Sequence, residues 1–155
     1  MKLIYKEKSF FDEDIEVFDE KGLLIAQINK ERGKYNLIYQ DNAYFIIKKT
    51  GFFIFNSKIL NRNDETDFIT LNLKSNFELN FKENNTIFEK YFYKIDYPLG
   101  FNFHLLNSKN EIVANGKKVS ITNNGIIEYK ESIDLKIILF FILIRLSRSE
   151  LMINK

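Results

Sequence analysis

The chain contains no cysteine, which excludes disulfides, thiolate metal sites and cysteine nucleophiles. Histidine is nearly absent as well, because His104 is its single representative. A zinc site would therefore need carboxylates for most of its ligands, which is uncommon. The sequence also lacks a phosphate-cradling glycine loop, a nucleophile elbow and a metal-binding helix motif. From these absences we predict no catalytic residue, no metal site and no cofactor.

An excess of charge of one sign is also missing, because 23 basic residues face 21 acidic ones for a net charge of +2. Domains that bind nucleic acid are usually clearly basic, so we expect no nucleic-acid partner. The segment 89–94 interleaves aromatic residues with lysines in the manner of a base-stacking face. With so balanced a charge, ordinary packing of a strand explains this segment better.

The N-terminal segment has no long apolar run, since three apolar residues at 3–5 are followed at once by charges. A secretory signal needs an apolar stretch of about 7–15 residues, so we expect a cytoplasmic protein. No linker or shift of composition divides the 155 residues, and 45% of them are hydrophobic. We therefore predict a single domain over residues 1–155.

What the sequence does contain is alternation of apolar and polar residues, the period of a β-strand. The clearest strands are predicted at residues 15–18, 35–39, 68–73, 77–81 and 86–95. Asn- and Gly-rich turns separate them, since these residues tolerate positive φ angles. Predicted turns include 19–22, 31–33, 40–42, 108–110 and the pair Asn115–Gly116. These short connections predict an antiparallel meander of about a dozen strands, which must close or fold over to protect its edges.

One segment breaks the alternation, because residues 137–144 are apolar without interruption. Eight residues of helix span only about 12 Å, far less than a bilayer core, so a transmembrane helix is disfavoured. A central β-strand is a rival interpretation, since a short apolar run has no diagnostic period. Ser132 as N-cap, Asp134 in the first turn and Arg145 near the end favour a helix at about 133–146. Apolar on all sides, this helix is expected to be buried.

A similar pattern occurs twice, since residues 18–26 and 106–114 each place an Asp or Asn and a Lys before a strand that ends in Ala. Two hairpins of one type would produce this pattern without any duplication. Together with the order of many strands followed by one apolar helix, these hairpins resemble the tubby C-terminal-like superfamily. That superfamily also includes the phospholipid scramblases and the plant LURP-one-related proteins. The resemblance spans roughly residues 4–144 and rests on pattern.

The resemblance implies a closed antiparallel β-barrel around a central apolar C-terminal helix. It also implies binding of anionic lipid headgroups by basic residues on the barrel surface. Candidates by charge alone are Lys48, Lys49, Lys117 and Lys118. The cysteine-rich and calcium-binding segments of scramblases are missing, which counts against that activity.

Two further groups of residues carry side chains that are common in catalytic or metal sites. His104 alternates with Phe103 and Leu105, and a lone strand histidine is usually structural or exposed to solvent. The acidic run 12–16 lacks the ligand spacing and central glycine of a calcium loop, so we expect a solvated loop that leads into a strand.

The sequence thus favours a non-enzymatic binding domain, monomeric and peripheral to the membrane, that recognises an anionic lipid surface or a protein partner. Two alternatives stay open. One is a small cytoplasmic structural protein without a lipid role. The other is a ligand carrier or an enzyme with a cleft that no motif reveals.

Overall fold

The computed structural model describes the backbone of residues 1–9, 12–50, 55–62, 67–72, 77–83, 86–95, 102–118 and 123–152. Side chains are described for residues 1–9, 13–46, 59–62, 90–94, 102–118 and 123–147. The elements are β1 (Lys2–Ser9), β2 (Asp12–Asp19), β3 (Leu24–Glu31), β4 (Lys34–Tyr39), β5 (Asn42–Thr50), β6 (Phe55–Asn61), β7 (Asp67–Asn72), β8 (Phe77–Glu83), β9 (Thr86–Ile95), β10 (Asn102–Asn107), β11 (Ile112–Lys118), β12 (Gly125–Tyr129) and α1 (Leu135–Met152).

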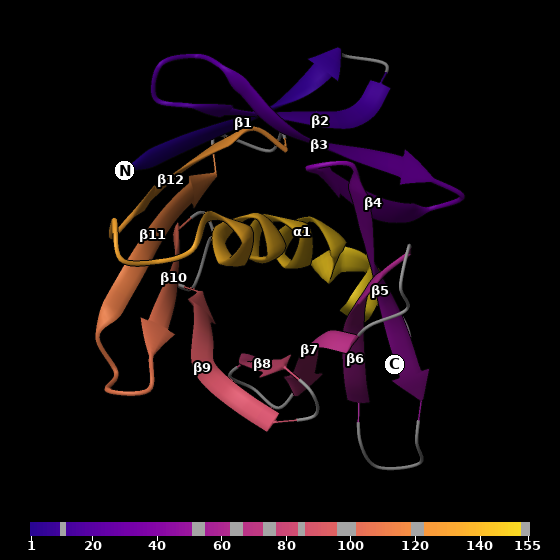
Figure 1. The fold of residues 1–155 in the computed structure, drawn as a ribbon. Coiled ribbons are helices and arrows are strands. Elements are labelled where there is room, and N and C mark those ends of the chain that lie inside the picture. The colour runs from indigo at the N-terminus through magenta and orange to yellow at the C-terminus, as the bar shows by residue number, and fades with distance from the viewer. Residues whose placement is uncertain are drawn as a thin grey trace.

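Every strand pairs antiparallel with the next strand along the chain, and β1 also pairs with β12. The order of hydrogen-bonded neighbours therefore returns to its starting point, and we call this circuit the strand ring. Figure 1 shows α1 enclosed by the ring. A mainly β, antiparallel fold followed by one C-terminal helix was predicted from alternation and from the apolar run, and this prediction is confirmed.

The apolar run lies in the first half of α1 and is buried on every side, since residues 137–144 are each 5% exposed or less. Its two phenylalanines make edge-to-face contacts with aromatic rings of the surrounding strands. The ring of Phe140 lies 5.0 Å from that of Tyr44 on β5, and Phe141 lies 5.1 Å from Tyr93 on β9. Since aromatic pairs add to the burial of apolar area, these contacts fix the helix against two separate strands of the ring. Within the described residues, no helix is long and apolar enough to cross a membrane.

The start of α1 differs from the prediction. The helix begins at Leu135, and the Asp134 carboxylate accepts a 2.8 Å hydrogen bond from the backbone N–H of Lys136. The Asp134 carbonyl oxygen also accepts the N–H of Ile137 at 3.0 Å. Asp134 is therefore the N-cap, and the assignment of Ser132 to this role was wrong. The helix also extends beyond residue 146 to Met152, because Arg and Ser are compatible with a helix although they interrupt the apolar run.

The two similar sequence segments form hairpin loops of one type. The Asp19 carboxylate accepts N–H groups from Lys21 and Leu23, each at 2.9 Å. The Asn107 side chain accepts the N–H groups two and four residues onward in the same way, at 3.0 and 2.9 Å. Gly22 and Asn110 occupy the matching positive-φ position of each loop. Local hydrogen bonding thus accounts for the likeness, as expected for Asx turns.

The predicted turn at Asn115–Gly116 was wrong, because both residues lie inside β11. A Cβ atom on Gly116 would lie 1.9 Å from Cε2 of Phe103 on the neighbouring strand. Glycine is present here because the Phe103 ring, which is fully buried, packs across the backbone of β11. The sequence pair Asn-Gly therefore reflects packing in the interior, although it is also a strong hairpin signal.

Candidate functional site

A depression of about 310 Å³ lies on the outer surface of β10, β11, β12 and β1. We call it the outer pocket. Apart from Gly116, whose backbone is buried against Phe103, its residues are the outward-facing members of these strands, since their neighbours Phe103, Leu105, Ile127 and Leu3 are buried in the interior. The pocket is lined by Lys2, Asn102, His104, Asn115, Gly116, Lys117, Ile126 and Glu128.

Strand register arranges these residues in two rows across the strands. In the first row His104 is opposite Asn115, Asn115 is opposite Glu128, and Glu128 is opposite Lys2. In the second row Asn102 is opposite Lys117, and Lys117 is opposite Ile126. Side chains of directly opposed residues lie about 5 Å apart at Cβ, so the rows bring residues 2, 104, 117 and 128 within reach of one small ligand.

His104 is fixed in this pocket by its neighbour. Its Nδ1 lies 2.6 Å from the Asn115 side-chain oxygen. An amide oxygen can only accept a hydrogen bond, so Nδ1 is the donor in this contact. The predicted structural role of His104 is consistent with this hydrogen bond, while its place at the pocket gives it access to a ligand.

The four lysines proposed from the sequence are not brought together. Lys48 and Lys49 belong to β5, and their side chains lie outside the described residues. In the strand ring β5 is opposite β11, because five strands separate the two on either side. The pairs 48–49 and 117–118 therefore belong to strands on opposite sides of the ring.

Lys117 and Lys118 are themselves divided, since successive residues of a strand point to opposite faces. Lys117 is exposed at the outer pocket. Lys118 faces the interior side, opposite Gly125, at the rim of the ring. Burial and, in smaller part, the charge of Arg145 lower the pKa of Lys118, while Glu7 opposes this shift. Of the two predicted contacts whose side chains are described, Lys117 lies at the outer pocket and Lys118 does not.

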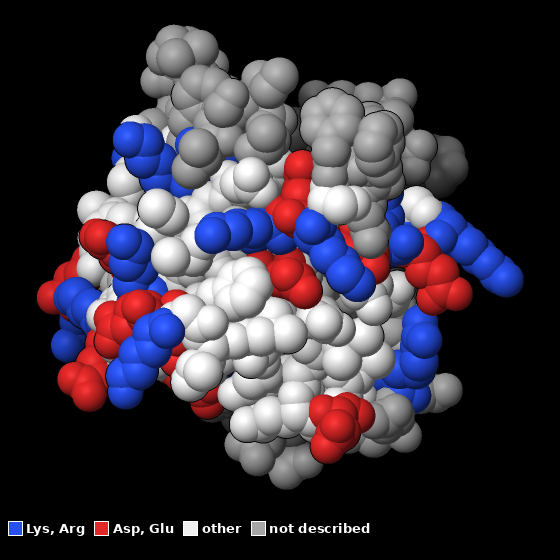
Figure 2. Space-filling model, turned by 90° about the horizontal axis from the view of Figure 1, so that it is seen from above, with Lys and Arg blue, Asp and Glu red and all other residues white. Residues whose placement is uncertain are grey.

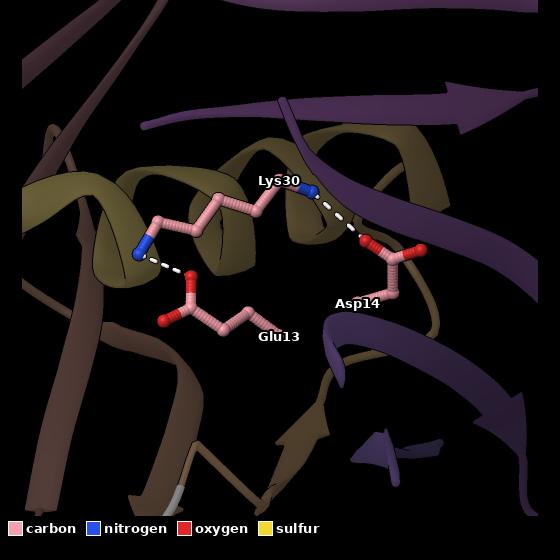
Figure 3. A network of polar contacts seen from close by, with 3 residues as sticks. All are labelled: Glu13, Asp14 and Lys30. Carbon is pink, nitrogen blue, oxygen red and sulfur yellow. Dashed lines mark hydrogen bonds and ion pairs between the residues drawn. The ribbon is translucent and has the colours of Figure 1, made fainter. Parts of the chain in front are cut away.

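The acidic run near residue 12 is engaged by a lysine (Figure 3). The Lys30 ammonium forms an ion pair with Glu13, and the backbone N–H of Lys30 donates to the Asp14 carboxylate at 3.0 Å. The expected loop is instead the first part of β2, which begins at Asp12. Among the described residues no cluster of three or more His, Asp or Glu side chains is placed to hold a metal ion.

Sequence reasoning missed Lys2, Asn102 and Asn115 as parts of a site. Lys2 and Lys117 line the same pocket because β1 pairs with β12, and β12 pairs on its other side with β11. No local pattern reports a pairing over more than a hundred residues. Alternation along the strands could have indicated which residues face outward, but not which strands are neighbours.

No protein-family model, curated protein or solved structure matches this chain.

Proposed function

We propose that this chain is a non-enzymatic binding domain, of tubby-like fold, that holds an anionic headgroup in the outer pocket. The observation that carries the proposal is the convergence of Lys2, Lys117 and His104 from three separate strands on one depression of about 310 Å³.

The likeness to a tubby-like barrel is supported by two features. The pairing order of the strands runs round to its start, and the apolar helix is buried. A closed barrel filled by its own helix has no interior space for a ligand, so recognition must take place outside. This argument disfavours the ligand-carrier alternative.

The chemistry of the pocket suits a phosphorylated polyol. Lys117 has Asn102 and Ile126 as its strand neighbours, so no carboxylate is directly opposite its ammonium group. A phosphate can accept hydrogen bonds from Lys117 and from a protonated His104. The amides of Asn102 and Asn115 and the carboxylate of Glu128 can bind hydroxyl groups. A membrane phosphoinositide and a soluble sugar phosphate share this chemistry.

Sedimentation with vesicles tests the proposal. One set of vesicles contains phosphatidylcholine alone, and the other also contains phosphatidylinositol phosphates. We expect binding to the second set only, and Lys117→Glu should weaken it about tenfold or more, since each lysine at an anionic surface contributes about 1 kcal/mol. Lys34→Glu, which changes the same charge at an exposed site at the start of β4, is the matched control.

Competition by a soluble inositol phosphate distinguishes the two sources of the ligand. Tight binding of the soluble compound with no sedimentation would identify a free polyol phosphate as the ligand. Equal, negligible binding of all these probes would overturn the proposal and leave a structural protein without a lipid role.

A further inference from the structure

The outer faces of β1 and β2 carry opposite charges. On β1 the outward residues are Lys2, Ile4, Lys6 and Lys8, and the outward residues of the β2 segment are Asp14, Glu16, Phe18 and, just beyond its end, Glu20. The register places Ile4 opposite Phe18 and Lys6 opposite Glu16. One strand is therefore basic and its neighbour acidic, with one large apolar residue at the same level of each.

An apolar stripe crosses this charged face. Ile126 on β12 is opposite Ile4, Ile4 is opposite Phe18, and Phe18 is opposite Leu24 on β3. The first three side chains are half-buried, and Leu24 is 48% exposed. Figure 2, seen from the side where β1, β2 and β3 lie in Figure 1, shows cationic, anionic and uncharged surface next to one another. We call the stripe with its flanking charges the hairpin face.

We propose that the hairpin face binds the hairpin face of a second copy of this chain, about a two-fold axis that runs between β1 and β2 parallel to both. Rotation about this axis preserves the level of each residue along the strands and exchanges the two strands. Lys6 then lies over Glu16 of the second copy, and Ile4 lies over Phe18 of the second copy. Ile126 and Leu24 are exchanged in the same way, so the stripe covers itself.

The symmetry of a two-fold contact explains why this arrangement favours a second copy. In an isologous interface each residue must be complementary to the residue to which the axis relates it. A basic strand beside an acidic strand satisfies that condition at the level of Lys6 and Glu16, and the apolar pair Ile4 and Phe18 satisfies it at the next outward level. An anionic membrane would attract the lysines of β1 but repel the carboxylates of β2, so it is the poorer occupant. This inference does not rest on the headgroup proposal, although both surfaces include Lys2 and Ile126. It differs from the monomer expected from the sequence.

The size of the face sets the expected strength. Strands of eight residues are roughly 25 Å long, and four strands at about 4.8 Å spacing are roughly 15–20 Å wide. This face is smaller than the roughly 800 Å² that each partner buries in a standard stable complex. We therefore expect a weak dimer, with a dissociation constant in the micromolar range. Two aligned sheets packed face to face are a common arrangement.

Sedimentation velocity over a concentration series provides the test. The wild-type chain should shift from one to two copies as its concentration rises through the micromolar range. At the level of residues 6 and 16, Lys6→Glu makes both strands acidic, and Glu16→Lys makes both strands basic. Each variant alone should dimerise at least about tenfold more weakly, because juxtaposed like charges are strongly unfavourable.

Mixing the two variants separates association from folding. In a mixed pair, Glu at position 6 of one chain meets Lys at position 16 of the other, and both original residues also meet. Equimolar Lys6→Glu and Glu16→Lys should therefore form a heterodimer with nearly the wild-type affinity. A hairpin that is merely destabilised by like charges within one chain would not be rescued by mixing. Neither substitution touches a residue of the outer pocket.

Three outcomes would overturn the inference. The wild-type chain could stay monomeric at every concentration, or mixing could fail to rescue two folded variants. Alternatively, Phe18→Ala could leave dimerisation unchanged while Lys34→Glu, outside the hairpin face, abolishes it. A monomer whose vesicle binding is lost in Phe18→Ala would assign the hairpin face to a lipid surface instead.

Discussion

At the scale of single residues, two buried aromatic rings occupy the space beside glycines of neighbouring strands. A Cβ atom on Gly125 would lie 2.1 Å from the Tyr5 hydroxyl oxygen, and Gly116 is related to Phe103 in the same way. Each glycine is thus required by packing, since neither has a positive φ angle. Because the Tyr5 ring packs against Gly125 of β12, its phenol is removed from water, with 2% of the residue exposed.

Tyr5 should make stability depend on alkaline pH. Burial, opposed in smaller part by the charge of Arg145, raises the pKa of Tyr5 from its ordinary value of 10.0 to about 12. The protonated phenol is therefore favoured in the folded state, so its contribution to stability is complete below pH 10 and is lost as the pH rises toward 12. We expect the difference in free energy of unfolding between the wild type and Tyr5→Phe to fall by about 2 kcal/mol across this window.

Urea unfolding at a series of pH values measures this difference, and Tyr5→Phe serves as the control because it retains every other titrating group. A difference that stays constant from pH 9 to pH 12 would show that the Tyr5 phenol titrates normally in the folded protein.

At the scale of elements, the cap of α1 offers a matched pair of substitutions. Asp134→Ala removes the side chain that accepts the Lys136 N–H, and we expect a loss of about 1 kcal/mol in the free energy of unfolding. Ser132→Ala alters the residue that the sequence suggested as the cap and should change stability by less than about 0.5 kcal/mol. Denaturant unfolding of both variants is the measurement, and the reverse ranking would restore Ser132 as the cap.

The elements themselves were largely predictable, because each follows from a local signal. The strand at residues 86–95 was predicted with the bounds it has in the structure, and the apolar run gave the helix. The exceptions arise where distant packing decides. Asn115–Gly116 has the sequence of a turn, but Gly116 is needed because the Phe103 ring packs against its backbone. The outer pocket depends on the pairing of β1 with β12. Neither effect leaves a pattern within a short stretch of sequence.

At the scale of the whole molecule, the ring and the helix should form one cooperative unit. The apolar run of α1 has no water-compatible face, so the helix is stable only inside the ring. We expect the far-ultraviolet signal of the backbone and the near-ultraviolet signal of the buried tyrosines to be lost at the same temperature. Phe140→Asp should abolish both signals, because it buries an unpaired charge against Tyr44.

Circular dichroism at the two wavelengths tests this expectation, and Lys130→Asp, at an exposed site before α1, is the control for adding a carboxylate. Two separate transitions, or a Phe140→Asp variant that melts cooperatively near the wild-type temperature, would show that the helix does not support the ring.

The position of α1 in the chain has a consequence for biosynthesis. All the described strands precede α1 in the chain, so they leave the ribosome before the helix that fills the strand ring. Nascent domains generally fold from the N-terminus as they emerge, at about 5–20 residues per second. The tyrosines and isoleucines of the strands therefore stay exposed to water for a time on the order of seconds, until α1 has been synthesised. We expect the nascent chain to expose this apolar surface until the helix can cover it.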